Sequence, residues 1–251
     1  MINNFIKFCY EQGWSNAIYT GGAIAAMVFQ LFFLMFYKKK YGFSLKQFIV
    51  LFAISTPLQY FSMFFLAWVE NGFKGWGANN IVRAFVYFPL FFALAAKVVK
   101  VPAKKVIDFA APSQALNQAI GHLVCPFAGC CQGYACSWGV WNPVSNERLF
   151  PNQWLECIVA LAIGWYLFYL AKKENYAGTG RIYAMFLILF GGTRFLLEFL
   201  RDNDKLFLGI SNLALHALFM ALVGAVWMMI IYENNQKQVL KEKNKKHHYV
   251  K

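Results

Sequence analysis

The chain has 251 residues, of which 59% are apolar and only 14% are charged, whereas a soluble domain usually has about 45 to 50% apolar and about 25% charged residues. This composition excludes an ordinary soluble globular domain. The net charge of +13 comes from basic residues beside apolar segments, where they act as topology signals and contact anionic lipid, so we predict no nucleic-acid partner.

Seven apolar segments are long enough to cross a bilayer, which takes about 20 residues of helix. They are residues 18–37, 48–69, 81–99, 108–125, 154–171, 182–200 and 207–232. The predicted fold class is therefore all-α, a polytopic membrane bundle of about seven transmembrane helices. Residues 1–17 precede this transmembrane domain of residues 18–232, and residues 233–251 form a basic tail. Pro112 and Pro126 interrupt the fourth segment, which is compatible with a broken or re-entrant helix.

Basic residues are distributed unevenly between the two ends of these segments. Seventeen lysines and arginines lie at one end and five at the other. Under the positive-inside rule, this bias places the N-terminus outside and the C-terminus in the cytoplasm. We therefore expect a multi-pass protein of the cell (plasma) membrane whose chemistry faces outward.

The fourth segment carries Gln114, Gln118 and His122 at positions i, i+4 and i+8, which share one face of a helix. Such polar stripes often only join helices through hydrogen bonds. Histidine, however, exchanges protons near neutral pH. His122 is therefore a candidate catalytic base, and Gln118 a candidate substrate-binding residue.

A cysteine cluster follows that segment: Cys125, Cys130, Cys131 and Cys136. Three interpretations are possible, namely disulfide bonds in an oxidising compartment, a metal site, or a reactive thiol. The spacing is not the CxxC pairing of zinc sites, so we predict no metal and no cofactor. The sequence does not decide between disulfides and a reactive thiol.

The sixth segment has the clearest polar pattern. Arg194, Glu198 and Arg201 are spaced i, i+4 and i+7, so they lie on one narrow face that cannot point at lipid. An arginine oriented by a carboxylate suits a phosphodiester, because its planar guanidinium donates two parallel hydrogen bonds. The alternative is an ion pair that only fixes helix packing.

Four sequence motifs, in order, resemble those of the prolipoprotein diacylglyceryl transferase family, and the resemblance covers roughly residues 80 to 230. The motifs are Asp108-Phe-Ala-Ala-Pro112, Gly121-His-Leu-Val-Cys-Pro-Phe-Ala-Gly129, Phe150-Pro-Asn-Gln-Trp-Leu-Glu156 and Gly191-Gly-Thr-Arg-Phe-Leu-Leu-Glu-Phe-Leu-Arg201. The last is the most specific, since both arginines and the glutamate are in register.

This chain departs from the family signature at several positions. His122 stands where the family has arginine, Cys125 where it has asparagine, and Cys130 where it has an acidic residue. The third segment has Ala84 to Leu90 in place of the family's His-Gly-Gly element.

The resemblance implies a transferase that acts on an outer-leaflet phospholipid similar to phosphatidylglycerol. The acceptor is a thiol, either of a lipoprotein precursor or of the chain itself. In this hypothesis Arg194 and Arg201 hold the phosphate, His122 removes a proton from the nucleophile, and Glu156 and Glu198 orient the cations. Cys130 places a thiol at the lipid site.

Two other hypotheses remain. One is a thiol redox or sulfur-handling membrane protein on the same scaffold, in which Cys130 and Cys131 exchange disulfides. The other is binding or transport without catalysis. The Arg194, Glu198 and Arg201 stripe favours the transferase, because thiol exchange needs no buried pair of arginines.

Overall fold

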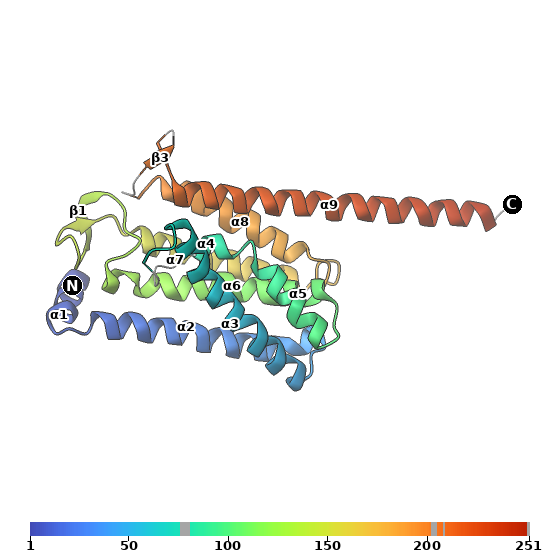
Figure 1. The fold of residues 1–251 in the computed structure, drawn as a ribbon, viewed down its shortest axis with the longest axis horizontal. Coiled ribbons are helices and arrows are strands. Elements are labelled where there is room, and N and C mark those ends of the chain that lie inside the picture. Colours follow the sequence, from blue (N-terminus) through green and yellow to red (C-terminus); the bar gives the residue numbers. More distant parts are fainter. Residues whose placement is uncertain (76–80, 202–204, 208, 250–251) are drawn as a thin grey trace.

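In the computed structural model, the described residues are 1–75, 81–201, 205–207 and 209–249. Long helices lie side by side along one axis, and the last helix extends past the others at its C-terminal end (Figure 1). The elements are α1 (Ile2–Glu11), α2 (Ser15–Tyr37), the 3-10 turn η1 (Lys38–Tyr41), α3 (Leu45–Glu70), α4 (Ile81–Ala84), α5 (Phe88–Val98), α6 (Ala103–Ala128), β1 (Ala135–Trp141), β2 (Arg148–Leu149), α7 (Asn152–Ala171), α8 (Arg181–Glu198), β3 (Lys205–Phe207), β4 (Ile210–Ser211) and α9 (Asn212–Tyr249).

Four helical segments of the described chain are long and apolar enough to cross a membrane. They are Ser15–Tyr41, Leu45–Glu70, Asn152–Ala171 and Asn212–Lys241. They correspond to the first, second, fifth and seventh predicted segments, which supports a helical membrane protein. The total of seven spans stays a prediction, as does the orientation of the termini.

The third and the last predicted segments differ from the structure. The third segment, residues 81–99, is not one continuous helix, because α4 ends at Ala84 and α5 begins at Phe88 with Pro89 in its first turn, where the missing N–H costs no hydrogen bond. The fourth segment is a continuous helix despite its two prolines. The last helix begins at Asn212 and not at 207, since β3 and β4 pair as a hairpin just before it.

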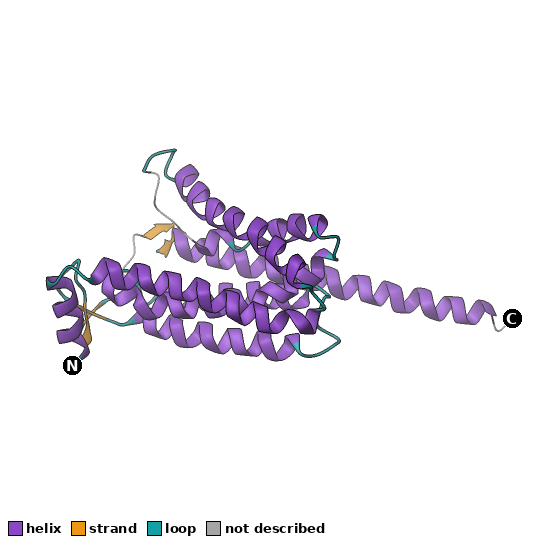
Figure 2. Cartoon of the chain, turned by 90° about the horizontal axis from the view of Figure 1, so that it is seen from below, coloured by secondary structure: helices purple, strands orange, loops and turns teal. Residues whose placement is uncertain are grey.

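The two ends of the bundle have different character. At one end, Lys105 Nζ lies 3.8 Å from where a Cβ on Gly42 would be and 5.5 Å from the centroid of the Phe43 ring. The Cα of the same lysine lies 3.9 Å from where a Cβ on Gly178 would be. These contacts bring together the three lysine-containing loops in or next to which Phe43, Lys105 and Gly178 lie. Figure 2 shows β1 and β2 at the opposite end, beside the N-terminus, where Asn3 donates to Gly139 O at 3.2 Å. The basic loops and the cysteine cluster thus lie at opposite ends.

Asp108 fixes α6 against the start of α8. Its buried carboxylate accepts backbone hydrogen bonds from Gly180, Ile182 and Tyr183 at 2.8, 3.1 and 3.2 Å. These are N–H groups that a helix leaves unpaired at its N-terminus. Asp108 therefore sets the position of α8, which carries Arg194, relative to α6, which carries His122.

Helices α8 and α9 pack closely through Gly191. A Cβ on Gly191 would meet Ala217 O and Ala221 N of α9 at 2.7 Å, whereas a Cβ on Gly192 meets nothing within 4 Å. Gly191→Ala is therefore expected to lower the free energy of unfolding by about 1 to 3 kcal/mol. Gly192→Ala should leave it unchanged or raise it, because alanine is the better helix former. Thermal unfolding of both variants in detergent measures the difference, and equal melting temperatures would contradict this packing.

Candidate functional site

Glu156 is the centre of a buried ion-pair network between α6, α7 and α8. Its Oε1 accepts hydrogen bonds from Arg194 Nη1 and from Arg201 Nη2 and Nε, the last two at 2.6 and 3.1 Å. Asn152, one turn earlier on α7, donates to the same oxygen at 2.9 Å. Both arginines thus converge on one carboxylate from a neighbouring helix.

Glu198 is the middle residue of the stripe predicted on the sixth segment, and it pairs with the same two arginines. Its Oε2 lies 3.2 Å from Arg194 Nη2 and 3.7 Å from Arg201 Nε. Ser211 donates to its other oxygen at 3.0 Å. The four ionic side chains are 4 to 6% exposed, and their charges cancel. The two glutamates therefore neutralise the two arginines, and the four side chains together carry no net charge.

His122 connects this network to the cysteine cluster. Its Nε2 lies 3.0 Å from Glu156 Oε2, and its Nδ1 lies 3.8 Å from Cys125 Sγ. A carboxylate on one ring nitrogen favours the tautomer with the proton on that nitrogen. The other nitrogen, Nδ1, is then the basic one, and it faces the thiols.

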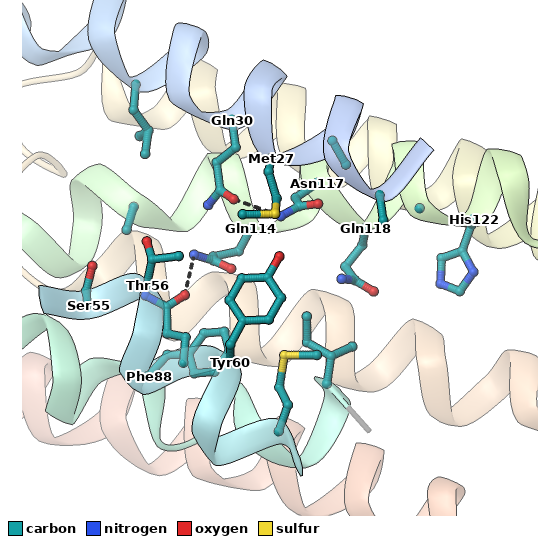
Figure 3. A pocket seen from close by; sticks show the side chains of 18 of the residues that line it. Met27, Gln30, Ser55, Thr56, Tyr60, Phe88, Gln114, Asn117, Gln118 and His122 are labelled. Carbon is teal, nitrogen blue, oxygen red and sulfur yellow. Dashed lines mark hydrogen bonds between the residues drawn. The ribbon is translucent and has the colours of Figure 1, made fainter. Parts of the chain in front are cut away.

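A cavity of 480 Å³ extends from His122 and the cysteines along α6 toward the middle of the bundle. Figure 3 shows amide side chains from α2 and α6 along its wall. Asn117 donates to Gln30 at 2.7 Å, and Gln114 donates to Gln59 at 3.3 Å. Gln118 also lines it, one turn before His122. The cavity is apolar with polar groups at intervals, as suits an amphipathic ligand.

Neither Arg194 nor Arg201 is among the described residues that line this cavity. Arg194 borders a separate space of 10 Å³ that His122 also lines, and Arg201 borders one of 40 Å³. Gln118 lines the large cavity but lies apart from the ion pairs. The predicted substrate-binding residues therefore border three separate spaces, and His122 lines both the large cavity and the small space at Arg194.

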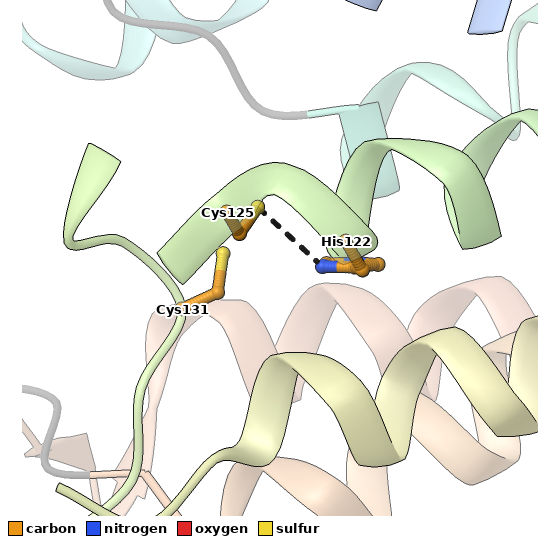
Figure 4. Close-up of side chains that lie close together, drawn as sticks. All are labelled: His122, Cys125 and Cys131. Atoms are coloured by element: carbon orange, nitrogen blue, oxygen red, sulfur yellow. Dashed lines mark hydrogen bonds between the residues drawn. The ribbon is translucent and has the colours of Figure 1, made fainter. Parts of the chain in front are cut away.

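The chain reverses direction immediately after α6, which brings the cysteines together. Gly129 ends the helix in the left-handed conformation, with φ of +67°, and Cys131 also has a positive φ, +61°. Asn142 Nδ2 donates to Gly129 O at 3.4 Å. All six cysteines are free thiols. Figure 4 shows Cys131 directed back toward Cys125 and His122.

The clustered thiols differ in acidity. Hydrogen bonds with Cys125 and Cys130 lower the pKa of Cys131 well below its usual range, despite burial. A hydrogen bond with Cys125 lowers the pKa of Cys130, but one with Cys131 and burial outweigh it and raise the pKa to about 12. The more acidic thiol is therefore Cys131 and not Cys130, the residue singled out from the sequence.

Sequence reasoning also missed three polar partners of the network. Asn152 and Ser211 hold the two carboxylates, and the backbone of Gly133 pairs with Arg201 in an isolated β-bridge. Of these three, only Asn152 could have been identified from the sequence, because it stands four residues before Glu156 and shares a helical face with it.

Comparison with known proteins identifies a matching family. Residues 18–231 match the family model described as prolipoprotein diacylglyceryl transferase. The phosphatidylglycerol–prolipoprotein diacylglyceryl transferase 2 of Clostridium perfringens is 27% identical over 183 residues, which cover 70% of this chain and 67% of that protein. The corresponding transferase of Clostridium tetani is 30% identical over 108 residues, covering 40% of this chain and 43% of that protein.

A third relative, the transferase of the same name from Dehalococcoides mccartyi strain 195, is 29% identical over 140 residues, or 53% of each chain. The chain thus spans between about two fifths and two thirds of the length of these relatives. The names of these relatives give no support to the thiol redox hypothesis.

Proposed function

The chain belongs to the prolipoprotein diacylglyceryl transferase family, and from this membership we propose that it transfers the diacylglyceryl group of phosphatidylglycerol to a thiol. The observation that carries the proposal is that His122 lines the large amphipathic cavity and also contacts the buried network that contains Arg194 and Arg201. A lipid bound in the cavity with its phosphate at His122 would bring that phosphate close to this network.

In the proposed reaction, the thiol gives up its proton and its sulfur forms a bond to the terminal glyceryl carbon of the lipid. The bond between that carbon and the phosphate oxygen breaks, and its electron pair leaves on glycerol phosphate. The products are a diacylglyceryl thioether, glycerol phosphate and a proton. Negative charge therefore increases at the phosphate as the reaction proceeds.

The arginines would stabilise that developing charge. Arg194 Nε is a buried donor without a hydrogen-bond partner among the described residues, so it is available to a phosphate oxygen. Arg201 lies close enough to Cys131 to favour its thiolate form. Glu156 and Glu198 fix the guanidinium planes, and fixed donors cost no reorganisation during reaction.

His122 would take the proton of the attacking thiol. Its Nδ1 faces the thiol cluster, while Glu156 orients the ring through Nε2, as in other base and orienting-group pairs. The acceptor thiol belongs either to a lipoprotein precursor or to the chain itself, where Cys130 lines the cavity. Gln118, on the same wall, would hydrogen-bond the polar headgroup.

We propose that this site faces outward, in the outer leaflet of the plasma membrane, because the basic loops lie at the opposite end of the bundle. A membrane-impermeant thiol reagent, applied to intact cells after mild reduction, should label Cys130 or Cys136. A cysteine introduced by Lys39→Cys, in an exposed turn, should stay protected. Labelling at position 39 alone would reverse the orientation.

Lipid analysis tests the substrate proposal without requiring turnover. Chain purified in mild detergent from mixed-lipid membranes should retain phosphatidylglycerol in preference to zwitterionic phospholipid, as measured by mass spectrometry of the extracted lipid. Gln118→Leu, which removes the proposed headgroup contact and keeps the volume, should reduce that preference. A retained lipid composition equal to that of the membrane would contradict the proposal.

A further inference from the structure

Three potential metal ligands converge where α6 ends. The Nδ1 or Nε2 of His122 and the Sγ atoms of Cys125 and Cys131 all lie within 4.8 Å of one another (Figure 4). Zinc bound tetrahedrally at ~2.3 Å from sulfur and ~2.0 Å from nitrogen places its ligand atoms about 3.5 to 3.8 Å apart. The separation of Cys125 Sγ and His122 Nδ1 is 3.8 Å. This separation is about 0.3 Å longer than the sulfur–nitrogen separation in such a zinc site, and the limit of 4.8 Å requires the other pairs to move inward by at most about 1.3 Å.

The other nitrogen of His122 has the partner that a metal-bound histidine usually has. Such histidines donate their second ring N–H to a carboxylate or carbonyl, which fixes the ring and raises its basicity. Here Nε2 lies 3.0 Å from Glu156 Oε2. Glu156 is itself held by Arg194, Arg201 and Asn152. The ring is thus oriented by a rigid buried network, with Nδ1 directed at the two thiols.

The backbone also brings the sulfur atoms together at a conformational cost. A non-glycine residue with positive φ costs about 1 to 3 kcal/mol and persists only where the surroundings enforce it. Cys131 has φ of +61°, and it stands two residues after Gly129, which is also in the left-handed conformation. That conformation returns the Cys131 side chain to the end of α6.

We propose that His122, Cys125 and Cys131 bind one Zn²⁺ ion, with a fourth position open to the cavity for a thiolate. Two sulfurs and one imidazole form a borderline-soft donor set that suits zinc, and three protein ligands with one open position are typical of catalytic zinc. The spacing of the cysteines alone does not indicate this site, because one of its ligands is a histidine one helical turn before Cys125.

A thiol in the fourth position has two sources. Cys130 belongs to the chain itself: its Sγ lies 3.6 Å from the carbonyl oxygen of Cys125, and it lines the same cavity as both ligand cysteines. The other source is the acceptor cysteine, and this part of the inference rests on the proposed transfer. A thiol that binds zinc loses its proton to water and stays nucleophilic. In the metal-bound chain His122 would serve as a ligand and not as the base. Coordination to zinc would lower the pKa of the acceptor thiol, whose proton passes to water, and the bonds made and broken are those given above.

The test is the metal content of the full chain, purified in detergent with zinc in the growth medium and without chelators. Elemental analysis should give about one zinc per chain, falling to background in Cys131→Ser and Cys125→Ala. Cys136→Ser is the matched control from the same cluster and should keep the metal. Size-exclusion profiles of the variants identify any that fail to fold. Cobalt added to the metal-free wild-type chain provides a second measurement, since tetrahedral thiolate coordination gives intense visible absorption.

The cobalt spectrum separates the two thiol sources. A spectrum that changes in Cys130→Ser assigns the fourth position to Cys130, and one that changes only when a cysteine peptide is added assigns it to the acceptor; both support the site. Background zinc in the reduced wild type together with no cobalt absorption would overturn it. If a metal-free chain carries out transfer, the proposed function stands without the metal. If the chain binds metal but carries out no transfer, the metal site stands and the proposed function fails.

Discussion

Glu156→Gln is expected to lower the rate of diacylglyceryl transfer ~100-fold or more, because it removes the shared anion that orients both arginines and His122. Two buried guanidinium groups would then share Glu198 alone. Removing one partner of a buried ion pair typically destabilises a protein by about 3 to 5 kcal/mol, so the melting temperature should fall as well. The rate is measured with reconstituted chain, phosphatidylglycerol and a cysteine peptide.

Glu147→Gln is the control for this variant, since Glu147 is exposed in the loop between β1 and β2. It should leave both the rate and the melting temperature unchanged. A Glu156→Gln variant with normal turnover would show that the network only joins helices. That outcome would support the packing interpretation of the arginine stripe.

Arg194→Lys separates charge from hydrogen-bond geometry. Lysine keeps the positive charge but cannot contact Glu156 and Glu198 with two fixed N–H groups while offering Nε to a phosphate. We expect a loss of ~10- to 100-fold in transfer rate, weaker retention of phosphatidylglycerol and a smaller loss of stability than in Glu156→Gln. Lipid extraction and thermal unfolding of the same preparation measure these effects.

Arg148→Lys is a matched control, because Arg148 is exposed and donates only to the Ser137 carbonyl among the described residues. It should not change lipid retention. Equal lipid retention and equal transfer rates in Arg194→Lys and Arg148→Lys would exclude a phosphate-binding role for Arg194.

Part of the arginine stripe could be predicted from sequence, because Arg194 and Glu198 are one helical turn apart and share a face of α8. Helical periodicity does not account for Arg201, since α8 ends at Glu198 and Arg201 follows it in an isolated β-bridge with Gly133, although it joins the same buried network. That network's neutrality could not be predicted from the stripe alone, since Glu156 comes from another helix. The family resemblance, and not spacing, pointed to Glu156.

Features that depend on local backbone conformation were less predictable. Hydrophobic length suggested one helix over residues 81–99, but a turn after Ala84 divides it. The contact of His122 with Cys125 and Cys131 depends on the left-handed conformation of Gly129 and on φ of Cys131. Neither backbone conformation is visible in the residue spacing, so the proximity of Cys131 to His122 and Cys125 could not be predicted.

The measurement that tests the proposed transfer most directly is the mass of the product on an acceptor thiol. Wild-type chain would be reconstituted in phosphatidylglycerol vesicles and incubated with a peptide that contains one cysteine, with the matching serine peptide as control. We predict that the cysteine peptide alone gains a diacylglyceryl group, in equal amount to the glycerol phosphate released. A gain of a single acyl group, or an unmodified peptide in the presence of folded chain that retains phosphatidylglycerol, would contradict it.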